Sequence, residues 1–244
     1  GVAQPPQVWG PDFANHEWYA ANLVNPWTPA GAQFTMGTGT AANPWWVGTY
    51  VTGPFPYSVD QWVRYIDGDD CFTVSYIIND GELGTPEDIT FFHAADLYVD
   101  GDDGGFGYYD AATGAVGAWN QPRDFLEYLV PLTVANGLPL PAASHYQEAS
   151  SQSIWDNIGD LSGPGPGFNN TILATPYHDS GCGLQWDLQL PGVPPDGNFV
   201  ELALDWCFLQ EEEPEFVPEP GSVMLLASGL MGLAGYAGLR KWRG

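Results

Sequence analysis

Two stretches decide the fold: residues 182–190 read CGLQWDLQL, and residues 199–209 read FVELALDWCFL. In both stretches large apolar side chains alternate with small or polar ones. This period of two is typical of β-strands that bury one face and expose the other. We therefore expect strands at Leu184–Leu190 and Phe199–Leu209, joined as a hairpin that closes a β-sandwich.

Short apolar runs also occur upstream, and turn-forming residues separate them. The turns include Asn79-Asp80-Gly81. The expected strands are Trp45–Thr52, Val59–Ile66, Phe72–Ile78, Ile89–Phe92, Leu97–Asp100 and Leu129–Val134. Repeated short strands between Gly- and Pro-containing turns predict an all-β fold, a β-sandwich of jelly-roll type. One short helix is expected around His145–Ile158.

The composition supports a packed body and excludes a nucleic-acid partner. The chain has 244 residues, and its 11 Trp, 12 Tyr and 12 Phe supply a large apolar core. Thirty Asp and Glu against five Lys and Arg give a formal net charge of −25. A polyanion such as DNA or RNA is repelled by that charge.

The uneven distribution of charge divides the chain. Residues 1–209 form the expected β-domain, and residues 210–220 form an acidic linker rich in Glu and Pro. Residues 221–239 carry no charge, and as a helix they span about 28 Å, close to the hydrocarbon core of a bilayer. Residues 240–244 are basic, so we expect them to stay in the cytoplasm. The basic side chains there are Arg240, Lys241 and Arg243.

Residues 217–244 resemble a PEP-CTERM sorting signal of Gram-negative bacteria. The resemblance rests on the motif Val217-Pro218-Glu219-Pro220, the single apolar helix and the Arg-rich segment after it. In that family an exosortase, a membrane protease-transpeptidase, recognises the signal. Its substrates are exported proteins that are often linked to biofilm or exopolysaccharide. The resemblance implies that Pro218, Glu219 and Pro220 form the sorting motif and that the helix holds the protein in the membrane before processing.

Two further features agree with export. The chain starts at Gly1 with neither a basic region nor an apolar run, so we expect that a signal peptide was removed. Residues 88–209 are also similar to a type of bacterial exported domain that often precedes anchor signals. That similarity rests on segments such as 107–110 (GYYD) and 183–186 (GLQW), and it implies no activity.

A short acidic motif occurs twice, since residues 65–70 read YIDGDD and residues 98–103 read YVDGDD. Closely spaced Asp on a Gly-containing turn offers hard oxygen ligands on a backbone that can wrap around Ca²⁺. The second copy departs from an EF-hand loop, because Ala111 stands where a bidentate Glu is required. We expect a Ca²⁺ site on loops of the sandwich, and solvated turns are the alternative. The candidate ligands are Asp67, Asp69, Asp70, Asp100, Asp102 and Asp103.

Other functional classes fit parts of the sequence. The pair Asp69-Asp70 followed by Asn79 is similar to the loops of Ca²⁺-dependent lectins. Trp45, Trp46 or Trp62 would then provide a stacking surface for sugar. The segment His178-Asp179-Ser180-Gly181 is similar to part of the trypsin-like protease motif but lacks the preceding Gly. A glycoside hydrolase would need a carboxylate pair as acid and base, and thirty acids make any such pair uninformative.

Three cysteines leave one unpaired if a disulfide forms. Strand parity argues against Cys182 with Cys207, because Cys182 shares the apolar face of its strand and Cys207 does not. A bulge would permit that pair. Cys71 also points outward and is an alternative partner for Cys207, so the pairing stays open.

Together these patterns predict a non-enzymatic extracellular structural protein of the cell surface or biofilm matrix. We expect it to self-assemble into filaments or layers with Ca²⁺. The expected partners are an exosortase-type enzyme, further copies of the chain or exopolysaccharide, and the membrane before processing. The alternative is a Ca²⁺-dependent carbohydrate-binding or adhesin module anchored at the surface.

Overall fold

A computed structural model of the chain describes residues 17–18, 28–29, 34–52, 57–80, 86–135, 137–160, 163–191 and 199–210. The chain divides into two units, Gly1–Glu211 and Glu212–Gly244, and the described residues all belong to the first. The predicted sorting motif, the apolar segment 221–239 and the basic residues after it lie outside the described residues.

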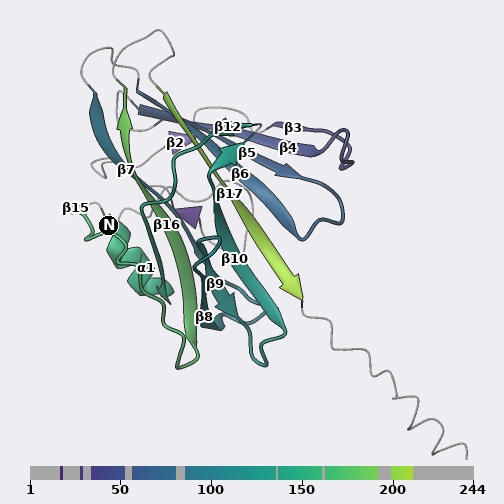
Figure 1. Cartoon of the computed structure of the whole chain (residues 1–244), viewed down its shortest axis with the longest axis vertical. Coiled ribbons are helices and arrows are strands. Elements are labelled where there is room, and N and C mark those ends of the chain that lie inside the picture. The colour runs from purple at the N-terminus through teal and green to yellow at the C-terminus, as the bar shows by residue number, and fades with distance from the viewer. Residues whose placement is uncertain are drawn as a thin grey trace, which may run out of the picture. The chain divides into compact units, whose positions relative to one another are not determined.

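The first unit is built mainly of antiparallel strands (Figure 1). The first strands are β1 (Glu17–Trp18), β2 (Thr28–Pro29), β3 (Phe34–Met36), β4 (Trp45–Thr52), β5 (Tyr57–Tyr65), β6 (Cys71–Asp80), β7 (Glu87–Asp96), β8 (Gly104–Asp110) and β9 (Ala115–Trp119). The later elements are β10 (Phe125–Leu132), β11 (Val134–Ala135), β12 (Leu138–Pro139), β13 (His145–Ser150), α1 (Ser151–Ile158), β14 (Gly159–Asp160), β15 (Gly163–Pro164), β16 (His178–Leu190) and β17 (Phe199–Gln210).

The long strands form two layers that are joined along one seam. The first layer has the order β1-β7-β16, with β13 also paired to β16. The second layer has the order β8-β9-β10-β17-β6-β5-β4, with β2 and β3 at its far edge. The seam is a short pairing of β16 with β8, in which His178 lies opposite Gly105 and Asp179 opposite Gly104. The predicted all-β sandwich with one short helix is confirmed.

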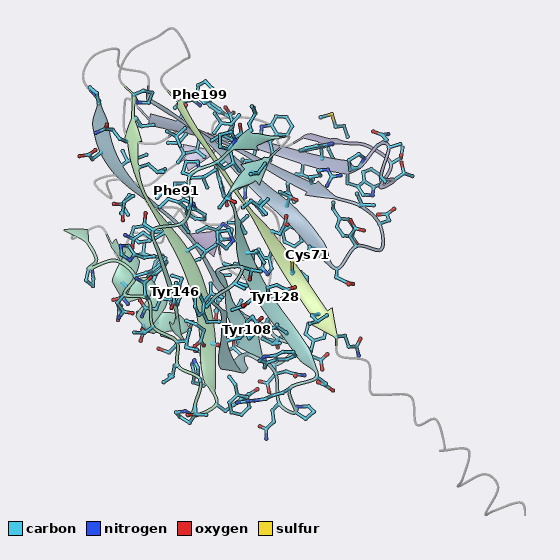
Figure 2. All side chains as sticks on the ribbon, in the orientation of Figure 1. Cys71, Phe91, Tyr108, Tyr128, Tyr146 and Phe199 are labelled. Carbon is cyan, nitrogen blue, oxygen red and sulfur yellow. A yellow bond between two sulfur atoms is a disulfide. The ribbon has the colours of Figure 1, made fainter. Side chains whose placement is uncertain are left out.

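A hydrophobic core fills the space between the layers. It takes Phe91 and Trp186 from the first layer and Tyr76, Leu202 and Leu204 from the second, all less than 2% exposed. The rings of Tyr76 and Phe91 meet across the two layers with centroids 4.9 Å apart. Figure 2 shows the Phe91 side chain inside the sandwich. The period-two pattern correctly placed Leu184, Trp186, Leu202 and Leu204 in the core, but Gln185, Ala203 and Cys207, which it assigned to the wet faces, are buried as well.

The predicted hairpin between β16 and β17 is wrong. β16 pairs with β7, β13 and β8, whereas β17 pairs with β6 and β10. The two strands therefore belong to opposite layers and face each other through the core. An alternating pattern specifies a buried face but does not say which strand lies beside it.

The helix expected around His145–Ile158 is shorter than predicted. Residues 145–150 form β13 along β16, and α1 begins at Ser151. The Ser150 side chain caps the helix, since its Oγ accepts a hydrogen bond from the backbone N–H of Ser153 at 3.3 Å. Ile154 and Ile158 pack against Phe92 on the outer face of the first layer. Pairing with β16 thus overrides helix propensity before the cap.

The strand expected at Leu97–Asp100 is instead the bend between β7 and β8. Leu97 and Val99 are fully buried. The backbone reverses at Asp100 and Gly101, which have φ angles of 53° and 80°. The N–H of Asp102 donates to the Val99 carbonyl at 3.2 Å and closes this turn.

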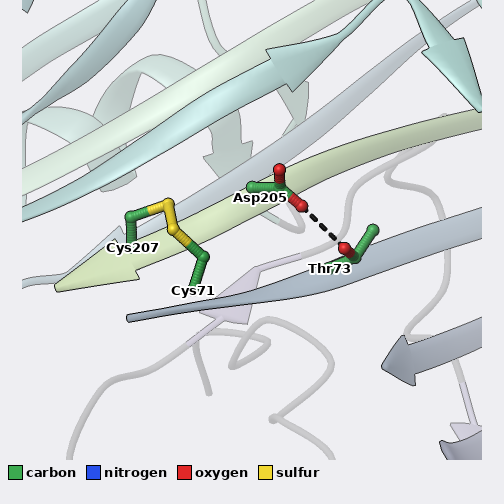
Figure 3. Close-up of a disulfide and its surroundings, with 4 residues drawn as sticks. All are labelled: Cys71, Thr73, Asp205 and Cys207. Atoms are coloured by element: carbon green, nitrogen blue, oxygen red, sulfur yellow. Dashed lines mark hydrogen bonds between the residues drawn. A yellow bond between two sulfur atoms is a disulfide. The ribbon is translucent and has the colours of Figure 1, made fainter. Parts of the chain in front are cut away.

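Cys71 and Cys207 form a disulfide between β6 and β17 (Figure 3). They lie directly opposite each other in the register of the two strands. Beside them, the Thr73 hydroxyl donates to Asp205 Oδ1 at 2.7 Å. Cys182 is a buried free thiol in the core. Cys182 and Cys207 are therefore not bonded to each other, as strand parity predicted.

Candidate metal centre and the acidic end of the sandwich

Both Asp-Gly-Asp-Asp turns lie at one end of the sandwich. The first turn joins β5 to β6, and the second joins β7 to β8. The strand registers place the starts of β6, β8 and β10 at the same end of the second layer as the last residues of β17. Carboxylates separated by more than thirty positions in the sequence are thus gathered at one end of the layer, where β9, β10 and β17 lie between the two turns.

In the first turn, Asp67 makes hydrogen bonds that hold the turn against the rest of the second layer. Its carboxylate accepts a hydrogen bond from Trp45 Nε1 at 2.9 Å, and its N–H donates to the Gly39 carbonyl at 2.8 Å. Asp69 and Asp70 are exposed at the tip of the turn. These three carboxylates do not converge on a common point within the described residues.

In the second turn, two of the three carboxylates are engaged with donors. Asn120 Nδ2 donates to Asp100 Oδ2 at 3.5 Å. The Tyr177 hydroxyl donates to Asp102 Oδ2 at 2.5 Å, and this bond raises the pKa of Tyr177 to about 12. Only Asp103 points toward other carboxylates that are placed to share an ion.

Asp103 joins Asp96 and Asp179 in a cluster that we call the corner cluster. One carboxylate oxygen from each residue lies within 4.8 Å of the others. Asp96 is the last residue of β7, Asp103 directly precedes β8, and Asp179 is the second residue of β16. Of the predicted candidate ligands, the structure brings only Asp103 into a group of three among the described residues.

Burial and mutual repulsion make the corner cluster electrostatically strained. Burial, then the charges of Asp103 and Asp179, raise the pKa of Asp96 to about 6. The pKa of Asp103 is also raised, by burial and then by Asp179 and Asp102. Asp96 Oδ1 is buried and has no hydrogen-bond partner among the described residues. A cation between the three carboxylates would remove both problems.

The dimensions of the corner cluster suit Ca²⁺. Calcium binds oxygen at 2.3–2.6 Å, so its ligands lie up to about 5 Å apart. Three carboxylates offer between three and six oxygens, and water fills the remaining positions of a six- to eight-coordinate ion. The spacing of residues in the sequence could not identify Asp96 and Asp179 as candidate ligands, because the seam between β16 and β8 brings them to Asp103.

The lectin-like set is not assembled. Asp70 directly precedes β6, while Asn79 lies at the opposite end of that strand. Nine residues of extended strand separate them by about 30 Å. Asn79 Nδ2 donates to the Ile77 carbonyl at 3.4 Å. These residues therefore do not hold one ion together.

A second polar cluster lies next to the corner cluster and is buried. Glu148 Oε1 accepts a hydrogen bond from the Ser180 hydroxyl at 2.6 Å and lies 2.8 Å from His178 Nε2. Glu148 Oε2 accepts from the Leu173 N–H at 2.8 Å. In the sequence, His178 and Ser180 stand out only as part of a segment similar to a protease motif. Both residues turn to Glu148 rather than to each other.

The comparisons with known proteins identify the C-terminal segment. The sequence pattern of the PEP-CTERM protein-sorting motif matches residues 216–241. Residues 216–241 are a PEP-CTERM sorting signal. The signal makes this chain an exported, surface-associated protein that an exosortase processes. A search of curated proteins finds no match to the chain. Within the described residues, no helix is both long and apolar enough to cross a membrane.

Proposed function

We propose that the chain is a non-enzymatic structural protein of the cell surface or biofilm matrix, and that Ca²⁺ bound at the corner cluster stabilises its sandwich. The PEP-CTERM signal supports the location. The observation that carries the Ca²⁺ proposal is the buried, unpartnered Asp96 Oδ1 beside two further carboxylates. Extracellular fluid supplies Ca²⁺ at concentrations that suit weak sites on exported modules.

The position of the corner cluster explains how an ion would act on the whole fold. Its three ligands come from β7, from the start of β8 and from β16. β7 and β16 belong to the first layer and β8 to the second, and they meet at the seam. A Ca²⁺ ion held there cross-links the two layers where, among the described residues, two residue pairs join β16 to β8.

Thermal unfolding of the full chain with Ca²⁺ or EGTA tests this proposal. An ion present at a hundredfold excess over its Kd adds about 2.7 kcal/mol, which raises the Tm by roughly 5–10 °C. Asp103→Asn should abolish that shift. Asp156→Asn on the surface of α1 removes the same charge elsewhere and should leave it intact. A wild-type Tm that Ca²⁺ does not move contradicts the proposed site.

Electron microscopy tests the structural role. We propose that Ca²⁺-loaded copies associate into filaments or layers, because Ca²⁺ lowers the repulsion within a chain of net charge −25. Native material sheared from cells should show ordered polymers that EGTA disperses. Asp103→Asn should prevent them and Asp156→Asn should not. Monomers that are unchanged by EGTA contradict Ca²⁺-linked assembly.

A carbohydrate-binding module is the second candidate, and one observation favours it. Half-buried aromatic rings line the outer face of the second layer. The ring centroid of Tyr108 lies 6.1 Å from the ring centroids of both Trp119 and Tyr128. Tyr108 and Tyr128 are labelled in Figure 2. Aromatic faces stack on the apolar faces of sugars, so a glycan array with Tyr128→Ala as the negative control tests this candidate.

A further inference from the structure

Two tyrosine rings from opposite layers stack face to face against the core. Tyr109 lies on β8 of the second layer, and Tyr146 lies on β13 of the first layer. Their ring centroids are 3.9 Å apart, and the ring planes differ by 10°. Aromatic pairs usually keep their centroids about 4.5–7 Å apart, so this contact is unusually close. Both rings are half-buried, so part of each side chain is exposed to solvent.

The backbone on each side holds the two rings in this position. The Tyr146 N–H donates to Asn170 Oδ1 at 3.0 Å, and the Tyr146 carbonyl accepts from the Asn170 N–H at 2.9 Å. The Leu173 N–H donates to the Glu148 carbonyl, and the Leu173 carbonyl accepts from the Gly107 N–H, both at 3.2 Å. Gly107 and Glu148 each lie two residues from one of the stacked tyrosines. The two strands are therefore tied together beside the stack, which preorganises the pair.

The two phenol groups of the stack also point the same way. Burial raises the pKa of Tyr146, and a hydrogen bond with the Tyr109 side chain raises it further. The hydroxyl is the hydrogen-bonding group of a tyrosine side chain, so this bond joins the two hydroxyls. In a parallel stack with adjacent hydroxyls, the carbons ortho to the two oxygens face each other.

This arrangement matches the geometry of phenol coupling. One-electron oxidation of a phenol leaves unpaired spin on its oxygen and its ortho carbons, in orbitals perpendicular to the ring. Two such radicals therefore form a carbon–carbon bond through their ring faces. A second tyrosine pair, Tyr108 and Tyr128, has centroids 6.1 Å apart and an interplanar angle of 67°. Those two rings meet edge to face, which does not bring their ortho carbons face to face.

We propose that Tyr109 and Tyr146 are a modification site, which a one-electron oxidant of the peroxidase class converts into a dityrosine cross-link. Each phenol loses one electron and its hydroxyl proton, and the two radicals form one bond between ortho carbons. The protons on those carbons then move to the oxygens and restore both phenols. One molecule of hydrogen peroxide accepts the two electrons and the two protons and becomes two molecules of water.

The cross-link adds a covalent bond between the two layers. The Cys71–Cys207 disulfide joins β6 to β17, which both belong to the second layer. The PEP-CTERM signal places the chain outside the cytoplasm, where oxidised side chains persist. No residue of the corner cluster takes part, so the cross-link does not depend on Ca²⁺.

Oxidation of the dilute full chain with a haem peroxidase and hydrogen peroxide tests the proposal. Dityrosine fluorescence should appear in the monomeric product, and mass spectrometry should find the Tyr109 and Tyr146 peptides joined and lighter by two hydrogen atoms. Tyr109→Phe keeps the ring but not the phenol, and it should lower the dityrosine yield about tenfold. Tyr108→Phe, on the same strand but on its outer face, is the matched control and should leave the yield unchanged. The cross-linked wild type should have a Tm roughly 5–15 °C above that of the untreated protein.

Several results would overturn the assignment. A dityrosine yield that Tyr109→Phe does not change would place the reaction on other tyrosines. Joined peptides that contain Tyr108 and Tyr128 would show that face-to-face stacking does not direct the coupling. Dityrosine confined to dimers would show that only tyrosines of different copies react, and absence of dityrosine would show that the stacked pair does not couple. Thermal unfolding confirms that Tyr109→Phe folds, and Tyr146→Phe removes the other phenol and should give the same loss.

Discussion

His178 Nε2 lies 2.8 Å from Glu148 Oε1, and the side chain of Glu148 is completely buried. His178 Nδ1 lies 2.9 Å from the Pro176 carbonyl, which only accepts, so Nδ1 carries a proton. One further proton must then lie between His178 and Glu148. This pair holds the segment before β16 against β13, where Leu173 bonds to both the carbonyl and the carboxylate of Glu148.

This pair predicts a pH-dependent stability that Glu148→Gln should remove. Burial raises the pKa of Glu148 above its ordinary value of 4.5, although hydrogen bonds from Ser180 and Leu173 and the charge of His178 oppose the shift. The Glu148 carboxyl of the folded protein therefore stays protonated up to a higher pH than that of the unfolded chain. Because of that difference, the free energy of unfolding should fall as pH rises from about 4.5 through the raised pKa.

Urea unfolding between pH 4 and 7 measures this slope. The Gln side chain of Glu148→Gln cannot titrate. The slope of its free energy of unfolding against pH should therefore be less negative than that of the wild type in this range, whatever its absolute stability. A Glu148→Gln slope equal to that of the wild type would show that the carboxyl does not titrate differently on folding.

The sequence predicted side-chain orientation better than strand neighbours. The alternation in Leu184–Leu190 and Phe199–Leu209 identified the buried faces, because each apolar side chain loses water whichever strand lies beside it. Pairing depends on long-range register, and no local signal showed that β16 lies beside β7. The same limit applies to the corner cluster, where the repeated motif supplied Asp103 but the seam supplied Asp96 and Asp179.

β8 and β9 are two of the strands that the sequence analysis did not predict. β8 reads GGFGYYD and β9 reads AVGAW, and their small residues lower the strand propensity. Small residues are required there, because Gly105 lies against Ala118 and Gly107 lies against the Glu148 carboxylate. Close packing at the seam thus selects residues that a propensity scale assigns to turns.

Asp96→Asn should have opposite effects on the free energy of unfolding with and without Ca²⁺. Its pKa of about 6 means that folding takes up a proton between pH 3.8 and 6. Without metal, stability should therefore fall as pH rises through that window. Asp96→Asn should raise the metal-free free energy of unfolding at pH 7.5 by about 1 kcal/mol, a value reduced because Asp96 is partly exposed to solvent.

With Ca²⁺ bound, the wild type should instead be more stable than Asp96→Asn. The ion requires deprotonated carboxylates, so its affinity for the wild type should rise up to about pH 6 and then level off. Asp96→Asn should gain no stability from Ca²⁺ at any pH. Calorimetric titration at pH 5 and 7.5 measures both effects. A Ca²⁺ affinity that is the same at the two pH values contradicts the assignment of Asp96 as a ligand.

The Cys71–Cys207 disulfide should be the main covalent contribution to stability. It closes a loop between residues 136 positions apart, so its loss should lower the free energy of unfolding by about 2–5 kcal/mol. Cys71→Ser with Cys207→Ser should reproduce the effect of reducing the wild type. In the unreduced wild type, a thiol reagent should label one cysteine, Cys182, and only after unfolding. Rapid labelling of the native protein would contradict this pairing.

Gly117 should be among the least replaceable residues of the second layer. A Cβ there would overlap the Glu127 carbonyl oxygen and lie 2.5 Å from Tyr128 Cα, both in the backbone of β10. Neither atom can move without separating β9 from β10, whose register pairs Gly117 with Tyr128. Gly117→Ala should therefore cost about 2–4 kcal/mol in urea unfolding.

Gly137→Ala is the matched control for this substitution. Gly137 has a φ of +80° but open space around its Cα, so its substitution should cost only about 1 kcal/mol through backbone strain. The excess loss in Gly117→Ala then measures the steric effect at the β9–β10 contact. Equal losses in the two variants would show that β9 and β10 lie farther apart than this register requires.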